Sequence, residues 1–241
     1  MNRQLAEIIE NSNNIVFFGG AGVSTESGIP DFRSESGLYH AREVYGYAPE
    51  TILSHSFYMQ HPDLFFKYYK ENLIHTEAEP NEAHKALAEL EKQGKLKAVV
   101  TQNIDGLHQK AGSRTVYELH GSVLRNNCER CGAFYDLDYI MDPAHCADGV
   151  PVCGKCGGRI KPDVVLYEES LDEDCITGAV NAIMNADVLI VGGTSLAVYP
   201  AAGLINYFHG SHMVLINRDS TPYDGKADLV IHDSIGEVMK L

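Results

Sequence analysis

Short apolar runs recur along the chain, with turn residues or polar segments between them. Many are rich in β-branched residues, which is typical of strands that are buried on both faces of a sheet. The runs of this kind are 15–19 (IVFFG), 97–101 (KAVVT), 116–119 (VYEL), 187–193 (DVLIVGG), 213–217 (MVLIN) and 228–232 (DLVIH). We therefore expect each of these segments to form a strand.

Helical patterns alternate with many of these runs. One helix is predicted to begin at Asn81, a favourable N-cap, and to stop before Gly94. Another is predicted from Ser170 and Glu173, which have the spacing of a capping box and precede apolar residues at helical intervals. Strands and helices in alternation predict an α/β fold built on a doubly wound parallel sheet.

Two segments interrupt this alternation and are predicted to form a smaller lobe. The first carries aromatic residues and histidines in a helical or loop pattern, and the second carries most of the cysteines. The expected division is a Rossmann-like large domain of residues 1–33, 81–122 and 160–241, a helical insertion of 34–80, and a metal-binding module of 123–159.

Composition and charge narrow the class of partner. The formal net charge is −14 and the isoelectric point is about 5.1. Phosphate contacts need clustered lysine and arginine, so a nucleic-acid surface is not expected, and cationic partners such as lysine-rich peptides suit this field better. The longest apolar stretch, IVFFGGAGV, is far shorter than a membrane-spanning helix, and no signal peptide is visible. We expect a cytoplasmic, monomeric protein.

The cysteines predict a metal site. Four of the six form two Cys-x-x-Cys pairs, each followed by glycine where the chain must turn: Cys128, Cys131, Cys153 and Cys156. Four thiolates at this spacing specify a tetrahedral Zn²⁺ that is structural, because no position is left open for water. Cys146 and Cys175 lack such partners and are expected to be packing residues.

Two glycine turns follow predicted strands. In GGAGVSTESG, Gly20 and Gly22 would let backbone N–H groups approach a phosphate, although a Gly-x-Gly-x-x-Gly fingerprint fails at Thr25. The second turn, GGTS, contains Thr194 and Ser195. Two such turns favour a two-ended ligand such as a dinucleotide, while each alone could be an ordinary strand-to-helix turn.

Polar side chains gather at the expected carboxyl edge of the sheet, where parallel α/β sheets bind ligands. Asn103 and Asp105 follow the strand at 97–101, and His120 follows the strand at 116–119. Asn217, at the end of another strand, could contact a ribose. A lone histidine is more often structural than catalytic, so the residues alone leave both interpretations open.

In this order, the segments GAGVSTESGIPDFR, TQNIDGLHQKAG, ELHGS, the paired Cys-x-x-Cys knuckles, GTSLAVYPAA and LINRD resemble the sirtuins, which are NAD-dependent protein-lysine deacylases. The resemblance covers nearly the whole chain. It implies a Rossmann-like large domain and a smaller lobe of zinc module and helices, with NAD and acyl-lysine entering the cleft between them from different sides.

The resemblance also implies roles for particular residues. Ala21, Gly22 and Thr25 would hold the pyrophosphate region, with Phe32 and Arg33 covering the cofactor, and Gln102 would contact a ribose. Asn103, Ile104 and Asp105 would form the nicotinamide pocket, and Gly193, Thr194, Ser195, Asn217 and Asp233 would bind the adenosine half. His120 would be the general base, Asn103 would assist catalysis, and Val164, Val165 and Leu166 would contact the peptide. The same resemblance makes His108 a structural residue.

The implied reaction is NAD-dependent deacetylation of acetyl-lysine in proteins or peptides. The acetyl group passes to ADP-ribose, and nicotinamide, O-acetyl-ADP-ribose and free lysine are released. NAD is then a co-substrate that is consumed, and one Zn²⁺ is structural. This makes the chain an acyl transferase to ADP-ribose, or formally a hydrolase.

The chain departs from the family pattern in two places. Where sirtuins usually carry Phe-Gly-Glu, this chain has Tyr167-Glu168-Glu169, which adds negative charge beside the expected peptide and favours basic flanking residues. Members that prefer succinyl or malonyl groups carry a tyrosine and an arginine three residues apart in the helical insertion. Here Tyr68 precedes Glu71 and Tyr69 precedes Asn72, so neutral acyl groups are expected.

Four other functions fit parts of the sequence. The same cleft could activate NAD for mono-ADP-ribosyl transfer or for removal of another acyl group. A zinc-ribbon binding module without catalysis would explain the four cysteines but not the negative charge or the glycine turns. A dehydrogenase is disfavoured because the third glycine of the fingerprint is missing.

Overall fold

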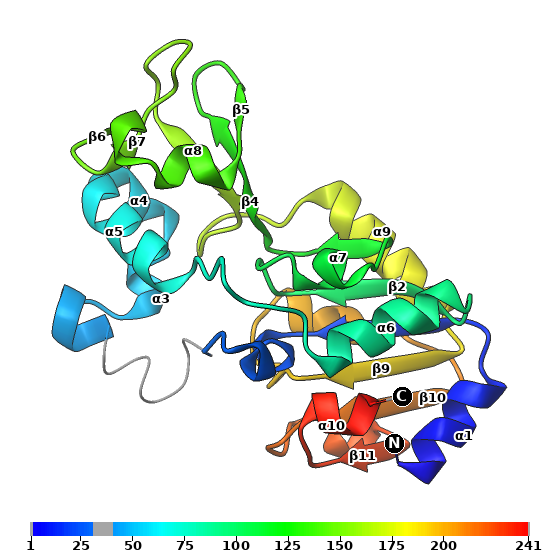
Figure 1. Ribbon diagram of the computed structural model, residues 1–241. Helices are drawn as coiled ribbons and strands as arrows, with labels where there is room; N and C mark the ends of the chain where they lie inside the picture. Colours follow the sequence, from blue (N-terminus) through cyan, green and yellow to red (C-terminus); the bar gives the residue numbers. More distant parts are fainter. Residues whose placement is uncertain (1, 31–40, 241) are drawn as a thin grey trace.

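The central element of the molecule is a six-stranded sheet, seen in the lower part of Figure 1. The computed structural model describes residues 2–30 and 41–240. The strands lie in the order β11-β10-β9-β1-β2-β3, and every neighbouring pair is parallel. Their bounds are β1 Ile15–Gly19, β2 Leu96–Thr101, β3 Val116–Glu118, β9 Val188–Gly192, β10 His212–Ile216 and β11 Leu229–Ile231. All six apolar runs therefore form strands, and the α/β prediction is confirmed.

The strand order places a switch point in the middle of the sheet. From β1 the chain proceeds outward through β2 and β3 on one side, and it later proceeds through β9, β10 and β11 on the other. Loops after β1 and β9 therefore leave the same edge in opposite directions. Ligands of doubly wound folds bind in the crevice that this arrangement creates.

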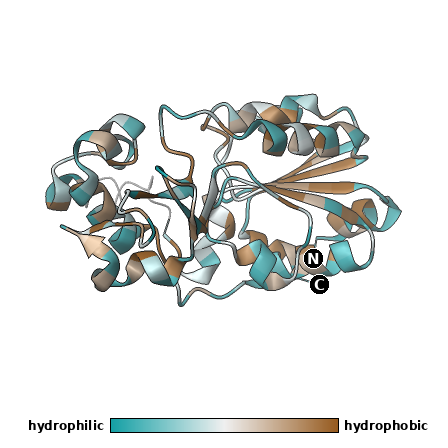
Figure 2. Ribbon diagram, turned by 90° about the horizontal axis from the view of Figure 1, so that it is seen from above, coloured by the Kyte–Doolittle hydropathy of each residue, from teal (hydrophilic) through white to brown (hydrophobic). Residues whose placement is uncertain are grey.

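Side chains alternate between two apolar layers along the strands. Phe17 and Ile190 point to the layer formed with α1 (Arg3–Asn11), α6 (Glu82–Lys92) and α10 (Ile235–Met239). Phe18 and Val191 point to the opposite layer, formed with α9 (Glu173–Asn185) and the 3₁₀ helix η4 (Ala201–Tyr207). Figure 2 shows the hydrophobic strands between these two layers of helices. Continuous apolar runs are required because both faces of the sheet are covered.

The ends of α6 agree with the sequence, and the start of α9 does not. Asn81 caps α6 by accepting a hydrogen bond from the Ala83 N–H at 3.0 Å, and Gly94 follows the helix with φ of +75°. The predicted N-cap Ser170 is wrong, because Asp172 caps α9 and accepts from the Cys175 N–H at 2.7 Å. Glu173 is consequently the first helical residue.

The smaller lobe contains a helical segment and a β-rich segment that share one apolar cluster. The helices are α3 (Pro49–Ile52), α4 (His55–Gln60) and α5 (Pro62–Asn72). The β-rich segment contains β4 (Gly121–Cys128), β5 (Phe134–Tyr135), α8 (Leu137–Met141), η3 (Pro143–His145), β6 (Cys146–Ala147), β7 (Val150–Pro151) and β8 (Ile160–Val164). Phe57, Phe65 and Tyr69 pack in the same cluster as Val123 and Ile160. The two segments therefore stabilise each other.

Strands β4 and β8 connect the lobes, as Figure 1 shows. They pair antiparallel, with Gly121 opposite Val164 at one end and Cys128 opposite Ile160 at the other. Short helices complete the described chain: η1 (Ala21–Val23), η2 (Thr25–Ser27), α7 (Leu107–Ala111) and η5 (Asp224–Lys226). Among the described residues, no helix combines the length and the apolar character needed to cross a membrane.

Candidate functional site

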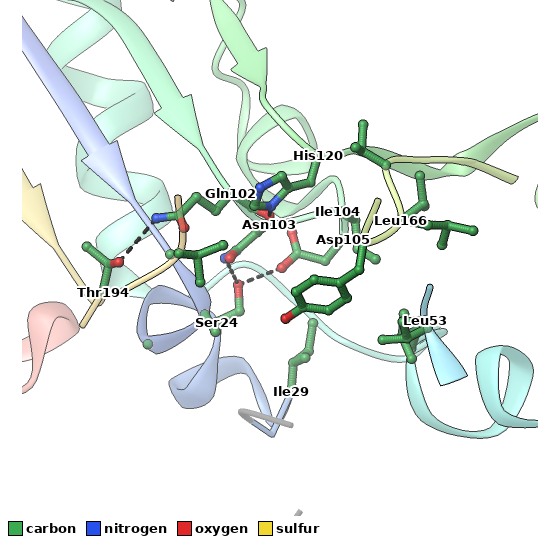
Figure 3. A pocket seen from close by; sticks show the side chains of 18 of the residues that line it. Ser24, Ile29, Leu53, Gln102, Asn103, Ile104, Asp105, His120, Leu166 and Thr194 are labelled. Carbon is green, nitrogen blue, oxygen red and sulfur yellow. Dashed lines mark hydrogen bonds between the residues drawn. The ribbon is translucent and has the colours of Figure 1, made fainter. Parts of the chain in front are cut away.

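One cleft lies between the carboxyl edge of the sheet and the smaller lobe. Much of its lining comes from segments that follow four strands: Gly20–Gly22 after β1, 102–105 after β2, 193–195 after β9, and Val165–Glu169 after β8. Leu53 and Leu73 of the smaller lobe also line it. His120 lines the same cleft. The predicted gathering of polar residues at this edge is therefore found, and Figure 3 shows the cleft from close by.

A short hydrogen-bond chain fixes the polar floor of the cleft. The Asn103 side-chain amide donates to Ser24 Oγ at 3.0 Å, and Ser24 Oγ donates to Asp105 Oδ2 at 2.7 Å, as drawn in Figure 3. The other carboxylate oxygen of Asp105 accepts from the Leu107 N–H at 2.9 Å. Both side chains are thereby held in one orientation before any ligand arrives.

Ser24, the middle residue of this hydrogen-bond chain, is not among the site residues predicted from the sequence. It is buried, with 1% of its surface exposed, and it lies between η1 and η2. The glycines of this segment predict a phosphate-binding turn, whereas Ser24 forms hydrogen bonds with the polar groups after β2. A hydrogen bond between residues 81 positions apart leaves no local pattern in the sequence. The only signal for Ser24 is that it lies within the segment GAGVSTES.

His120 stands in a tight connection between β3 and β4. The strand ends at Glu118, one residue earlier than predicted, and His120 follows it as expected. His120 Nδ1 lies 3.0 Å from the Gln102 carbonyl oxygen, and the His120 carbonyl accepts from the Val165 N–H at 3.0 Å. Because a carbonyl can only accept, this contact places the proton of the neutral ring on Nδ1 and a lone pair on Nε2.

The two glycine turns pack directly against each other. The Gly22 N–H donates to the Gly193 carbonyl at 2.8 Å, and a Cβ on Gly22 would lie only 2.8 Å from the Gly193 Cα. Thr194 Oγ1 accepts from the Gln102 side-chain amide at 3.1 Å, which ties this contact to the segment after β2. Close backbone packing thus requires glycine here, independently of any phosphate.

The remaining predicted cofactor residues are distributed unevenly. Ala21, Ile104 and Ser195 line the cleft with the residues above. Within the described ranges, Thr25, Asn217 and Asp233 are not among its lining residues. Thr25 Oγ1 donates to the Gly22 carbonyl at 3.0 Å, and Asn217 Nδ2 donates to the Asp219 carbonyl at 2.8 Å. Phe32 and Arg33 lie outside the described residues.

His108 is placed in the core rather than in the cleft. Its ring packs against His84 at 4.7 Å and Phe17 at 6.1 Å between centroids, and neither ring nitrogen has a hydrogen-bond partner among the described residues. Burial lowers the pKa of His108 to about 3, and burial likewise lowers the pKa of His84 to about 4. Both rings are therefore neutral near pH 7.

This buried pair predicts acid sensitivity. The folded pKa values lie below the value of about 6.5 for unfolded histidine, so the unfolded chain binds more protons as the pH falls below 6.5. With respect to these two histidines, the free energy of unfolding is expected to be highest above pH 6.5 and to fall by several kcal/mol towards pH 4.

Urea unfolding at pH 7, 6 and 5 measures this effect. His108→Leu is expected to flatten the pH dependence, and His212→Ala, which removes an exposed histidine, is expected to leave it unchanged. An identical slope in the wild-type chain and in His108→Leu would exclude this origin.

Two knuckles bring the four predicted cysteines together. The Sγ atoms of Cys128, Cys131, Cys153 and Cys156 all lie within 4.8 Å of one another. Each knuckle closes in the same way: the Gly132 N–H donates to the Cys128 carbonyl at 2.9 Å, and the Gly157 N–H donates to the Cys153 carbonyl at 2.8 Å. Both glycines have positive φ, of 68° and 69°.

The spacing of the sulfur atoms fits Zn²⁺. The distance is 3.5 Å between the Sγ atoms of Cys128 and Cys156, and 3.6 Å between those of Cys131 and Cys153. A tetrahedron with Zn–S bonds of about 2.3 Å has edges of about 3.8 Å, so small shifts would admit the ion. Four sulfur ligands would complete the coordination of the ion, so the site fits a structural rather than a catalytic zinc.

The chain is similar to known proteins over nearly its whole length. The Sir2 family model matches residues 20–200. An NAD-dependent protein deacetylase of Clostridium perfringens is 63% identical over 237 residues, covering 98% of this chain and 96% of the relative. One of Cutibacterium acnes is 56% identical over 236 residues, covering 98% and 95%.

Solved structures of Sir2 proteins are also similar to this chain. Sir2 with a p53 peptide and NAD⁺ has a TM-score of 0.87 and 36% identity, covering 99% of this chain and 96% of that chain. Sir2Tm bound to a propionylated peptide has a TM-score of 0.86 and 36% identity, covering 98% and 94%.

Proposed function

The chain belongs to the Sir2 family, and from that premise we propose that it is an NAD-dependent protein-lysine deacetylase. The acetyl group of acetyl-lysine is transferred to ADP-ribose, and nicotinamide, O-acetyl-ADP-ribose and free lysine are released. One observation carries the proposal above the others. The Asn103–Ser24–Asp105 chain and His120 face one cleft at the switch point of the sheet.

The donor set of the cleft fits NAD. Asn103 and Asp105 present an amide and a carboxylate, which complement a carboxamide, and Ile104 between them supplies an apolar contact. Gln102 is assigned to a ribose. The adenosine and pyrophosphate half is assigned to the packed turns and the strand ends beyond them: Ala21, Gly22, Thr25, Gly193, Thr194, Ser195, Asn217 and Asp233. NAD, when bound, would supply two things: a nicotinamide leaving group, and a ribose carbon that accepts the acyl oxygen.

The residues of this chain do the remaining work. Asp105 and Asn103 would hold the carboxamide in the orientation that the transition state requires, which favours departure of nicotinamide. His120 accepts a proton from a ribose hydroxyl at Nε2, while the Gln102 carbonyl holds Nδ1–H and keeps the ring in that tautomer. The buried Ser24 keeps the two pocket side chains aligned throughout.

The acyl-lysine peptide is assigned to the segment after β8. Val164, Val165 and Leu166 line the cleft, and the hydrogen bond from the Val165 N–H to His120 places this segment beside the proposed base. An extended peptide can add to such an edge as a strand, so that backbone hydrogen bonds fix the lysine. Acetylated proteins or peptides are thus the proposed partners.

Neutral acyl groups are the proposed substrates. Leu53, Leu73 and Leu166 line the cleft, and its lining contains no arginine within the described residues. Tyr69 is buried, and burial raises the pKa of its hydroxyl. The Tyr45 hydroxyl donates a hydrogen bond to Glu71 Oε2 at 2.5 Å, and the Asn72 side-chain amide donates to the same hydroxyl oxygen at 2.9 Å. A succinyl carboxylate would find no cation among these groups.

We also propose the domain division expected from the sequence: residues 1–33, 81–122 and 160–241 as the NAD-binding domain, and 34–80 with 123–159 as the small domain. The zinc module contributes no catalytic group. A cytoplasmic monomer that binds neither nucleic acid nor membrane completes the proposal, which the net charge of −14 supports with respect to nucleic acid.

Ser24→Ala tests the pocket. Loss of a hydrogen bond to a charged group costs about 1.5–3 kcal/mol, so kcat/KM for NAD is expected to fall roughly tenfold to a hundredfold. Ser113→Ala is the matched control, because Ser113 is also buried and its hydroxyl has no partner among the described residues. Equal kinetics in the two variants, with equal melting temperatures, would remove Ser24 from the pocket.

A panel of acyl peptides tests the function. Acetyl-, propionyl- and succinyl-lysine versions of one peptide are incubated with and without NAD, and mass spectrometry identifies the products. We expect NAD-dependent loss of the acetyl and propionyl groups and little loss of succinyl. ADP-ribose attached to protein, in place of O-acyl-ADP-ribose, would indicate mono-ADP-ribosyl transfer instead.

A further inference from the structure

The loop after β8 holds a glutamate in a conformation that favours glycine. Glu168 has φ of +75°, in the left-handed region that few residues with a side chain adopt. It lies on the rim of the cleft and is exposed. A residue kept there at a steric cost needs compensating contacts, and the structure shows them.

Glu168 is fastened to the start of α4. Its Oε2 accepts from the Ser56 N–H at 2.8 Å and from Ser56 Oγ at 2.6 Å. The neighbouring backbone is bonded on both sides of the turn between α3 and α4. The Tyr167 carbonyl accepts from the His55 N–H of α4 at 2.9 Å, and the Tyr167 N–H donates to the carbonyl of Leu53, which follows α3, at 3.0 Å. The carboxylate therefore occupies a defined position on the rim rather than sweeping through solvent.

The two carboxylates of this loop are not equivalent in charge. Glu169 forms ion pairs with Lys161 at 3.1 Å and, when the ring is protonated, with His55 at 2.9 Å. Glu168 forms no ion pair with any described residue, and its contacts are the neutral donors of Ser56. Those hydrogen bonds lower the pKa of Glu168, so it is ionised at neutral pH. A carboxylate without an ion-pair partner among the described residues thus remains on the cleft rim.

We propose that Glu168 is a specificity-determining residue that selects acyl-lysine peptides carrying lysine or arginine next to the acyl-lysine. The inference rests on the proposed function, because it assumes that the peptide adds along the loop after β8. Oε2 is occupied by Ser56, and Oε1 has no hydrogen-bond partner among the described residues, which leaves it available to a cationic side chain of the peptide. The net charge of −14 adds a field of the same sign.

Steady-state kinetics on three acetyl-lysine peptides, which differ only in having arginine, glutamine or glutamate beside the acetyl-lysine, test the proposal. For the wild-type chain we expect kcat/KM to be about fivefold higher with arginine than with glutamine, the upper end for an exposed ion pair. The preference should appear in KM and decline as salt is raised.

Two variants isolate the charge. Glu168→Gln keeps an oxygen that accepts from Ser56 but removes the charge, and Glu168→Gly restores the residue usual in the family, so both are expected to fold. Both should show an arginine-to-glutamine ratio near one. Glu237→Gln removes an exposed carboxylate from α10 and should keep the wild-type ratio.

A wild-type ratio near one, or the same ratio in the wild-type chain and in Glu168→Gln, would overturn the proposal. The glutamine peptide separates this result from failure of the proposed function, because NAD-dependent deacetylation of that neutral peptide is expected whatever Glu168 does.

Discussion

Replacement of His120 with alanine is expected to lower kcat for deacetylation by roughly a hundredfold to ten-thousandfold, the usual contribution of a positioned general base. Nδ1 of the ring is held by the Gln102 carbonyl at 3.0 Å, so the variant removes the base without removing a buried ion pair or a large core side chain. The melting temperature is therefore expected to change little. Because Asn103 and Asp105 remain in place, KM for NAD should change much less than kcat.

His212→Ala is the control for this variant. His212 is exposed and begins β10 at the opposite edge of the sheet from the cleft. Its activity should equal that of the wild-type chain. If His120→Ala kept more than a tenth of the wild-type kcat, another group would have to act as the base, and the assignment of His120 would fail.

Local patterns were sufficient to predict the sheet and the edge at which the polar residues meet. The continuous apolar run at 15–19 predicts a strand covered on both sides, and the structure confirms it, because Phe17 and Phe18 point to opposite apolar layers. Once the strands are parallel, the residues after β2 and the connection after β3 must lie at one edge. Proximity of Asn103, Asp105 and His120 followed from topology, without knowledge of any side-chain contact.

Removal of the metal is the second large effect. The two strands that link the lobes, β4 and β8, have the zinc knuckles at one end and the cleft at the other: β4 runs from Gly121, next to His120, to Cys128. Loss of Zn²⁺ would leave four thiols without a common partner and loosen both strands. We therefore expect deacetylation to be lost together with the metal, although none of the four cysteines that would bind the zinc takes part in the reaction.

The expected size of this effect follows from known zinc sites. Structural Zn²⁺ contributes several kcal/mol to folding, and about 1 kcal/mol corresponds to roughly 2–4 °C for a chain of this length. Cys153→Ser should therefore lower the melting temperature by roughly 10 °C or more, and elemental analysis of the wild-type chain should find one zinc per chain.

Cys175→Ser provides the matched control. Cys175 lies in α9 and is not one of the four clustered cysteines. The Cys175→Ser variant should therefore retain the metal and melt at the wild-type temperature. A Cys153→Ser variant that lost its zinc but melted like the wild-type chain would contradict the structural assignment of the site.

The parts that could not be predicted depend on contacts between distant segments. Ser24 lies about eighty residues before Asn103 and Asp105, yet it accepts a hydrogen bond from the first and donates one to the second. The sequence leaves the glycines after β1 open between a phosphate site and an ordinary turn, and only the structure shows that Gly22 packs against Gly193. Glu168 was identified as a departure from the family, but only the structure shows Ser56 holding its carboxylate.

The most direct test of the central proposal is the stoichiometry of the reaction. An acetyl-lysine peptide is incubated with the purified chain, and free lysine peptide, nicotinamide and O-acetyl-ADP-ribose are quantified by mass spectrometry with and without NAD. We predict that the three products form in a ratio of one to one to one with NAD, and that none forms without it. Deacetylated peptide in the absence of NAD, or nicotinamide released without deacetylation, would contradict the proposal.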